Sequence, residues 1–342
     1  MPDHPDVAQV VDRLEDHPAV VAWSTLAAGP SPSEVRVLKE RAKGITKSAV
    51  YWLKDAAPNG GPVIAKLAKR DVVAVESYVY REVLAHTSVE APHFYGTVED
   101  GGAWTWMFVE HIAGERYTPH RADHRRAAAK WVADLHVAAM ESASPPRLPD
   151  RGPGHLRGWV RRGRDAMTAV AGYPAATRDE LRTAEALRST LDALDSEWSE
   201  VTRAAGQLPR TLVHGDLVRK NLVVRGDRGV VAFDWEKAGW GSPALDLAYG
   251  DGGDVSKRFA ASPCLDTYRS VLSVHGLEVE RDVIAQCAAI GTALRCVFGI
   301  GWSAVSLNDR WVHHPMAYMT AYAPVLQRAM TAAGIGGRDA RN

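Results

Sequence analysis

The sequence predicts an α+β fold in two lobes, a small strand-rich lobe over residues 1–112 and a larger, mostly helical lobe over residues 113–342. Two observations lead to this prediction. Five short apolar runs with strand character lie between residues 35 and 112, with one helical pattern among them. From residue 121 onward the apolar spacing is that of helices, apart from a hairpin within residues 211–236. We therefore expect a five-stranded antiparallel sheet in the small lobe, next to a helical lobe.

Composition narrows the class of protein. A chain of 342 residues can form two domains or one two-lobed unit. Its 41 basic and 41 acidic residues balance, without the basic excess of a nucleic-acid surface. The three cysteines are odd in number and form no CxxC pair, which favours reduced thiols. The polar N-terminus is unlike a signal peptide, and we expect no apolar run to be long enough to span a bilayer. The expectation is a cytoplasmic monomer or homodimer without nucleic-acid or membrane partners.

The small lobe begins with a helical pattern inside residues 5–28, which Pro18 is expected to break. Strands follow from Val35 and over residues 49–53, and the turn 43–48 joins them. Such a turn could place backbone N–H groups and a hydroxyl over a phosphate. It contains only one glycine, so an ordinary hairpin is the alternative.

The third strand, over residues 62–67, contains Lys66 in an apolar setting. An unpaired buried charge is costly, so this lysine needs a partner. The helix predicted over residues 72–86 offers two candidates, Glu76 and Glu82. The alternative for Lys66 is an edge-strand lysine that reaches water.

The large lobe is expected to contain helices over residues 121–142, 155–171, 178–205 and 265–333. His136 lies beside the apolar face of the first of these helices and is expected to be a buried, hydrogen-bonded structural residue. The arginine-rich stretch 157–164 is either a solvated face or a phosphate-steering patch. Near the C-terminus, the aromatic residues around Trp302 and Trp311 are either core or a wall for an acceptor molecule.

The stretch 211–236 carries the chemistry. Strand-like runs over residues 222–224 and 230–233 flank a Gly-Asp-Arg-Gly turn, which is a hairpin pattern. Asp216 precedes the hairpin, Asn221 opens it and Asp234 ends its second strand. Phosphoryl transfer uses such a set, because one carboxylate can accept a hydroxyl proton while the other two side chains offer oxygen ligands to Mg²⁺. The alternatives are an ordinary turn with a strand cap, or a metallophosphoesterase, whose further Gly-Asp and Gly-Asn-His runs we do not find.

The order Asp, four residues, Asn and then a strand-end Asp is that of protein kinases. Here it is written His214-Gly215-Asp216, and Trp235-Glu236 follows Asp234. A Gly-x-Pro-x-x-Asp-Leu-Ala run begins at Gly241 and contains Asp246. In this form the sequence resembles the aminoglycoside phosphotransferase and choline kinase superfamily over residues 35–325. The resemblance implies a protein-kinase-like fold, with Asp246 bracing the catalytic loop.

The resemblance also implies ATP as phosphoryl donor and Mg²⁺ as cofactor. Lys66, held by Glu76, would contact the phosphates, and Thr46 would contact them from the nucleotide loop. Glu110 through Ile112 would offer backbone groups to the adenine edge. Asp216, Asn221 and Asp234 are the implied catalytic residues, and the last two also the metal ligands.

The acceptor implied is a small-molecule alcohol. An aminoglycoside-like compound or an amino sugar is the first expectation, and choline, ethanolamine or another small alcohol is the alternative. A hypothesis of another class is a non-catalytic, nucleotide-binding pseudokinase. A protein kinase would be expected to carry Asp-Phe-Gly and Ala-Pro-Glu motifs, and both are missing from this sequence.

Overall fold

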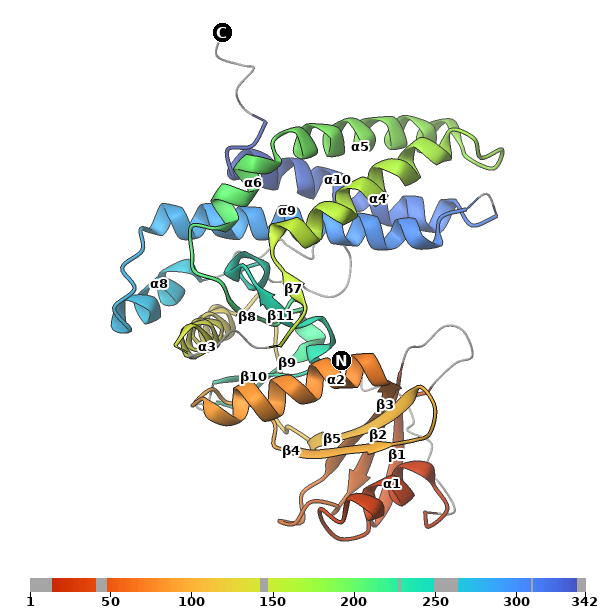
Figure 1. The fold of residues 1–342 in the computed structure, drawn as a ribbon, viewed down its shortest axis with the longest axis vertical. Coiled ribbons are helices and arrows are strands. Elements are labelled where there is room, and N and C mark those ends of the chain that lie inside the picture. The colour runs from red at the N-terminus through yellow and green to blue at the C-terminus, as the bar shows by residue number, and fades with distance from the viewer. Residues whose placement is uncertain are drawn as a thin grey trace. The chain divides into compact units, whose positions relative to one another are not determined.

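The computed structural model describes residues 14–40, 48–141, 147–226, 229–248, 264–308 and 310–336 (Figure 1). The chain divides into two compact units. The first comprises Met1–Glu115 together with Val231–Lys237, and the second comprises Arg116–Val230 with Ala238–Asn342. A seven-residue segment from late in the sequence therefore belongs to the N-terminal unit.

The first unit contains the predicted five-stranded antiparallel sheet, in the order β1-β2-β3-β5-β4. The strands are β1 (Glu34–Lys39), β2 (Ser48–Lys54), β3 (Val63–Lys69), β4 (Phe94–Glu99) and β5 (Trp104–Glu110). Lys66 pairs in register with Val50 of β2 and Met107 of β5. It therefore lies on the central strand, which rules out the alternative of an edge-strand lysine.

Two helical segments cover opposite faces of this sheet. Helix α1 (Pro18–Leu26) contributes Trp23 to a core that includes Ala65 and Phe108. Because successive side chains of a strand point to opposite faces, Lys66 points away from that core. It points toward α2 (Arg70–Tyr78), which continues as a π-helical turn (Val79–Val83) and a 3₁₀ turn (Leu84–His86).

The helical pattern is interrupted before Pro18, and Pro18 is itself the first residue of α1, so the described helix covers the later part of the predicted stretch. Proline fits the first turn of a helix, where its missing N–H has no intrahelical partner to lose. The side chain of His17 caps the same end by accepting a hydrogen bond from the Ala19 N–H at 3.3 Å. The pattern predicted upstream of Leu14 lies outside the described residues.

The second unit is mostly helical, as predicted (Figure 1). Its described long helices are α3 (Ala122–Met140), α4 (Pro153–Val170), α5 (Arg178–Ser196), α6 (Trp198–Ala205), α8 (Leu265–Val274), α9 (Arg281–Ser306) and α10 (His313–Ala332). Helix α9 packs against α4, α6, α8 and α10, and residues such as Ile290, Leu294 and Val297 are buried in this packing. It is the central helix of the unit.

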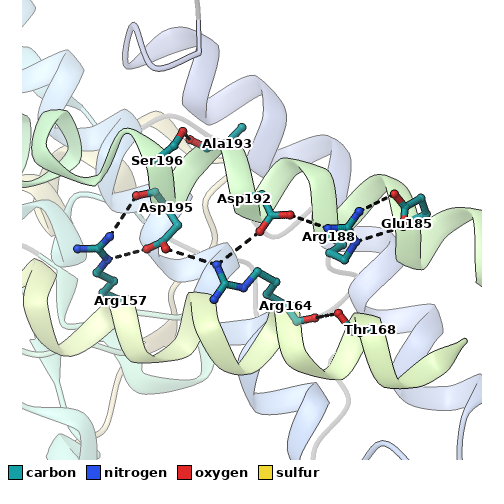
Figure 2. A network of polar contacts seen from close by, with 9 residues as sticks. All are labelled: Arg157, Arg164, Thr168, Glu185, Arg188, Asp192, Ala193, Asp195 and Ser196. Atoms are coloured by element: carbon teal, nitrogen blue, oxygen red, sulfur yellow. Dashed lines mark hydrogen bonds and ion pairs between the residues drawn. The ribbon is translucent and has the colours of Figure 1, made fainter. Parts of the chain in front are cut away.

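Ion pairs join α4 to α5 (Figure 2). The Arg157 guanidinium donates to Asp195 at 2.6 Å, and Arg164 lies 3.5 Å from both Asp192 and Asp195. The hydrogen bond from Arg157 is the main reason that the pKa of Asp195 is lowered. These two arginines of the stretch 157–164 therefore bind the neighbouring helix. Since the pairs are partly exposed, each contributes no more than about 1 kcal/mol to stability.

Helix α9 corrects one expectation from the sequence. Its 26 residues include an 18-residue window with a mean hydropathy of 1.7, so by length and composition it could cross a membrane. The expectation that no apolar run is long enough was therefore wrong. However, 56% of that window is buried inside the structure, as in a core helix. One such helix is weak support for a membrane span.

Short strands and 3₁₀ turns hold the segments between the helices. In the second unit, β8 (Thr211–Val213) pairs antiparallel with β11 (Gly239–Gly241), which pairs parallel with β7 (Asp150–Arg151). The predicted hairpin is present as β9 (Leu222–Val224) and β10 (Val230–Ala232), and the Arg225 N–H donates to the Gly229 carbonyl at 2.8 Å. The remaining strand is β6 (Glu115–Arg116), and 3₁₀ turns span Arg219–Asn221, Trp235–Lys237 and Pro243–Asp246.

Candidate active site

Lys66 is the centre of the site in the first unit. Its Nζ lies 2.5 Å from Glu76 Oε1 of α2 and 2.6 Å from Asp234 Oδ1. Lys66 and Glu76 are buried, whereas 28% of the Asp234 side chain is exposed. The partner predicted from the sequence is therefore present, and the second candidate, Glu82, instead pairs with Arg81 at the surface. One buried cation faces two carboxylates, of which only Asp234 is open to solvent.

The electrostatics of the three groups are coupled. Burial by itself would lower the pKa of Lys66, but the carboxylates of Glu76 and Asp234 outweigh burial and raise it. Burial raises the pKa of Glu76 to about 7, although Lys66 opposes this shift. The two raised pKa values imply different states for Glu76. A charged Lys66 favours an ionised Glu76, whereas the raised pKa of Glu76 favours its neutral form. We conclude that Lys66 is charged and that the Glu76 pKa is raised, since Glu76 is fully buried and its Oε2 has no hydrogen-bond partner within the described residues.

The backbone of Asp234 is in the left-handed region, with φ at 68°. A residue other than glycine rarely adopts this conformation, and such strain is often found at functional sites. The next residue, Trp235, is fully buried and contacts Tyr80 edge-on at 6.5 Å between ring centroids. Tyr80 in turn stacks on Phe94 of β4. This aromatic anchor holds the segment so that the Asp234 carboxylate reaches Lys66.

The second unit holds the other two residues of the motif. Asp216 is buried, and its N–H donates to His214 Nδ1 at 3.3 Å. Gly215 between them has a φ of 73°, a backbone conformation that residues with a side chain rarely adopt. The Asn221 carboxamide nitrogen donates to the Asp216 carbonyl at 2.9 Å. That bond uses the nitrogen, so the carboxamide oxygen is the Asn221 atom suited to a cation.

Asp246 braces this loop, as predicted. Its carboxylate accepts hydrogen bonds from the His214 N–H at 2.6 Å and the Gly215 N–H at 2.8 Å. Burial by itself would raise the pKa of Asp246, but contacts with His136, His214 and the Gly215 N–H outweigh burial and lower it. His136 is fully buried, lies 3.4 Å from Asp246 and contacts the Tyr268 hydroxyl at 2.8 Å. The expected structural role of His136 is thus confirmed.

Sequence reasoning missed one residue at the Asp216 carboxylate. Arg295 of α9 donates from Nη1 to the Gly215 carbonyl at 3.1 Å and from Nη2 to Asp216 Oδ1 at 3.2 Å. A signal for it was available, because a single arginine in the middle of a long apolar helix requires a buried partner. The partner could not be identified from the sequence, since 79 residues separate Arg295 from Asp216.

The residues predicted to contact the nucleotide are only partly described by the structure. Thr46 lies outside the described residues. Glu110 ends β5, and its N–H donates to the His93 carbonyl at 2.8 Å, while Ile112 is buried just beyond the strand. Their role at the adenine stays a prediction.

The donor set suits Mg²⁺ better than a protein-bound transition metal. Among the described residues, no group of three or more His, Cys, Asp and Glu side chains could hold a metal ion. Mg²⁺ usually binds through one or two carboxylates together with substrate phosphates, and it retains water ligands. Each unit offers one oxygen ligand of the type that Mg²⁺ prefers, the Asp234 carboxylate in the first unit and the Asn221 carboxamide oxygen in the second.

Solved structures of low sequence identity share this fold. A choline/ethanolamine kinase family protein from Mesorhizobium loti has a TM-score of 0.57 at 18% identity, covering 94% of this chain and 97% of its own. A macrolide 2′-phosphotransferase from Brachybacterium faecium has a TM-score of 0.52 at 18% identity, covering 85% and 91%. Spectinomycin phosphotransferase, in complex with ADP and spectinomycin, has a TM-score of 0.53 at 10% identity, covering 87% and 94%.

A search of curated protein sequences finds no significant match. At the level of sequence families, residues 37–250 match the phosphotransferase enzyme family. This match covers more than half of the chain, including β3, the hairpin and Asp246. The protein therefore belongs to the phosphotransferase enzyme family and is a phosphotransferase.

Proposed function

We propose that the protein catalyses the reaction ATP + R–OH → ADP + R–O–phosphate. The observation that carries this proposal is the buried Lys66, held between Glu76 and the partly exposed Asp234. A fixed cation of this kind neutralises phosphate charge, and phosphoryl transfer depends chiefly on such positioning and electrostatics. Similarity to a phosphotransferase that binds ADP supports ATP as the donor.

The residues of the chain have distinct roles in this reaction. Asp216 orients the acceptor hydroxyl and accepts its proton as the new oxygen–phosphorus bond forms and the bond to ADP breaks. Asn221 and Asp234 would supply oxygen ligands for Mg²⁺, which would offset the charge on the phosphates. Lys66 contacts the phosphates while Glu76 holds it in place. Thr46 and the backbone of Glu110 through Ile112 complete the proposed nucleotide contacts.

The second part of the proposal concerns the identity of the acceptor. We propose an aminoglycoside-like compound or an amino sugar, in line with the spectinomycin and macrolide phosphotransferases of similar fold. Choline, ethanolamine or another small alcohol is the second candidate, in line with the choline/ethanolamine kinase family protein.

A coupled assay of ADP release tests the proposal. Purified enzyme with ATP and Mg²⁺ is offered aminoglycosides, amino sugars, choline, ethanolamine and nucleosides, one at a time. We expect acceptor-dependent ADP release with a phosphorylated acceptor as product, detected by mass spectrometry. ATP binding without turnover of any acceptor would instead support the pseudokinase hypothesis.

A further inference from the structure

Arg295 makes a contact that neither the motif nor the proposed mechanism uses. Only 10% of its side chain is exposed, and 13% of its partner Asp216 is exposed. Its two guanidinium nitrogens clamp the same short stretch of backbone and side chain, at the Gly215 carbonyl and the Asp216 carboxylate. Asp246 holds the N–H groups of His214 and Gly215. In the loop that carries Asp216, the N–H groups thus donate to the carboxylate of Asp246, and the acceptor oxygens are bound by the guanidinium of Arg295.

The position of Arg295 is set by close packing of α9. A Cβ at Gly291, one turn before Arg295, would lie 1.7 Å from the Ala244 carbonyl oxygen, so only glycine fits there. Ala244 belongs to the 3₁₀ turn that ends at Asp246. The same turn therefore contacts α9 and braces the catalytic loop, which fixes the register of Arg295 against Asp216. A buried arginine without this partner would be strongly unfavourable, so the pair is a built feature of the unit.

We propose that Arg295 positions the Asp216 carboxylate and selects the charge of the acceptor at the reacting hydroxyl. This inference rests on the proposed function, in which that hydroxyl approaches Asp216. A hydroxyl that gives its proton to Asp216 lies about 3 Å from the carboxylate. The guanidinium of Arg295 lies 3.2 Å from the same carboxylate. A substituent on the carbon next to the hydroxyl would therefore lie beside the Arg295–Asp216 ion pair.

The physical consequence is a preference among acceptors. Because the site is mostly buried, charges there are screened weakly. Before proton transfer, the Asp216 carboxylate offsets the repulsion between Arg295 and an ammonium group next to the reacting hydroxyl. As Asp216 accepts the proton, the charge of Arg295 is no longer offset, so the ammonium group disfavours the transition state, whereas a neutral or anionic substituent does not. The acceptor class is thus narrowed to alcohols without a cation on the neighbouring carbon. Within the proposed candidates, this favours an N-acylated amino sugar, or a hydroxyl remote from the amines, over choline and ethanolamine.

Aromatic side chains extend the surface from Arg295 along α9. Phe298 and Trp302 follow at helical spacing on the same face and stack with 6.4 Å between ring centroids. Trp159 of α4 meets Phe298 edge-on at 4.9 Å. Nearly half of Trp302 is exposed. Rings of this kind suit the apolar face of a sugar-like acceptor, with its polar substituents toward Arg295.

The test compares acceptors that differ only in charge, using the full-length enzyme with ATP and Mg²⁺. Choline is paired with its neutral isostere 3,3-dimethyl-1-butanol, and glucosamine with N-acetylglucosamine and glucose. The variants are Arg295→Gln, Arg295→Lys and the control Arg281→Gln. Arg281 lies on the same helix but pairs with Asp266 at the surface.

We expect wild-type kcat/KM to favour the neutral member of each pair by about tenfold or more, as one repulsive contact of about 1.4 kcal/mol implies. Arg295→Gln should lower kcat with neutral acceptors and reduce this preference, while the KM for ATP stays unchanged. Arg295→Lys should restore the charge preference in part, and Arg281→Gln should behave as wild type. Slow hydrolysis of ATP, in which water is the acceptor, is measured in the same experiment. Its kcat should be lower in Arg295→Gln than in the wild type.

The outcomes separate the inference from the proposed function. A wild type that prefers the ammonium acceptors, or an Arg295→Gln variant with unchanged kcat and preference, overturns the role of Arg295 alone. A wild type that binds ATP but turns over neither the acceptors nor water overturns the proposed reaction, and with it the role of Arg295. Circular dichroism and ATP binding by Arg295→Gln show that the variant is folded.

Discussion

Glu76 illustrates how much a single buried residue can reveal about the site. It is fully buried, yet it must hold a lysine that also contacts Asp234. Burial raises its pKa to about 7 from an ordinary value near 4.5. A carboxyl with a pKa higher in the folded than in the unfolded chain stabilises the fold at low pH, and this stability is lost as pH rises through the folded pKa.

The first prediction concerns the pH dependence of stability. Relative to Glu76→Gln, the free energy of unfolding of the wild type should fall between pH 4.5 and pH 7.5, by at most about 3 kcal/mol. Urea unfolding at several pH values measures it. The control is Glu82→Gln, since Glu82 is an exposed glutamate a few residues further along the chain. Parallel curves for wild type and Glu76→Gln across this range would contradict the raised pKa.

The second prediction concerns the two carboxylates of the motif. Asp216→Ala and Asp234→Ala should each lower turnover at least about 10³-fold, as does the loss of one preorganised electrostatic group. The assay is acceptor-dependent ADP release at saturating ATP. Asp266→Asn serves as control, because Asp266 pairs with Arg281 at the surface. Near-normal turnover of Asp234→Ala at saturating Mg²⁺ would show that the metal assignment is wrong.

At the scale of elements, helix α9 connects packing to chemistry. It is the central helix of the second unit, and from one face it presents Arg295 to the loop that carries Asp216. Its approach to the 3₁₀ turn Pro243–Asp246 depends on the lack of a side chain at Gly291. The helix and the loop therefore cannot move independently, and a defect in packing should appear as a defect in catalysis.

A third prediction follows for glycines in two helices. Gly291→Ala should destabilise the protein by about 2 kcal/mol or more, because a methyl group overlaps the Ala244 carbonyl oxygen. Gly158→Ala on α4 is the matched control, since nothing lies within 4 Å of its added Cβ. That change should be neutral or stabilise by up to about 1 kcal/mol through helix propensity. Thermal and urea unfolding measure both, and equal effects of the two substitutions would argue against close packing at Gly291.

At the scale of the whole molecule, the predicted site residues are distributed between two units. Lys66, Glu76 and Asp234 belong to the first unit, and Asp216 and Asn221 to the second. The late segment 231–237 belongs to the first unit because Trp235 is buried beside Tyr80 and Asp234 pairs with Lys66. Sequence proximity along the hairpin is therefore a poor guide to which residues share a unit.

The fourth prediction is stabilisation by nucleotide. Mg²⁺ and ATP at about 100 times the dissociation constant should stabilise the wild type by about 2.7 kcal/mol, and so raise its melting temperature by several degrees. Lys66→Ala should lose most of this shift because it lacks the phosphate contact. Chelation of Mg²⁺ by EDTA should reduce the shift in the wild type. A full shift in Lys66→Ala, measured by differential scanning fluorimetry, would show that Lys66 does not bind the nucleotide.

Much of this molecule follows from the order of its residues. The five-stranded sheet, the hairpin and the need of Lys66 for a partner could be predicted, because period-two patterns, turn glycines and the cost of an unpaired buried lysine are local signals. The choice of Glu76 as that partner came from the family resemblance. The brace from Asp246 was accessible through a motif resemblance. The sequence indicated a break in the helical pattern at Pro18 but not the start of α1 there, because proline both breaks helices and begins them, and only the context decides between these roles.

Only the tertiary structure determined the contacts between residues that are distant in the sequence. It brought Arg295 onto Asp216, placed Tyr268 on His136 and turned the arginines of α4 toward α5. Each of these contacts joins residues that are far apart in the chain, so no spacing in the sequence encodes it. The residue types determine which chemical groups are available. The packing of helices determines which of these groups meet, because the surfaces that bring side chains together form only on folding.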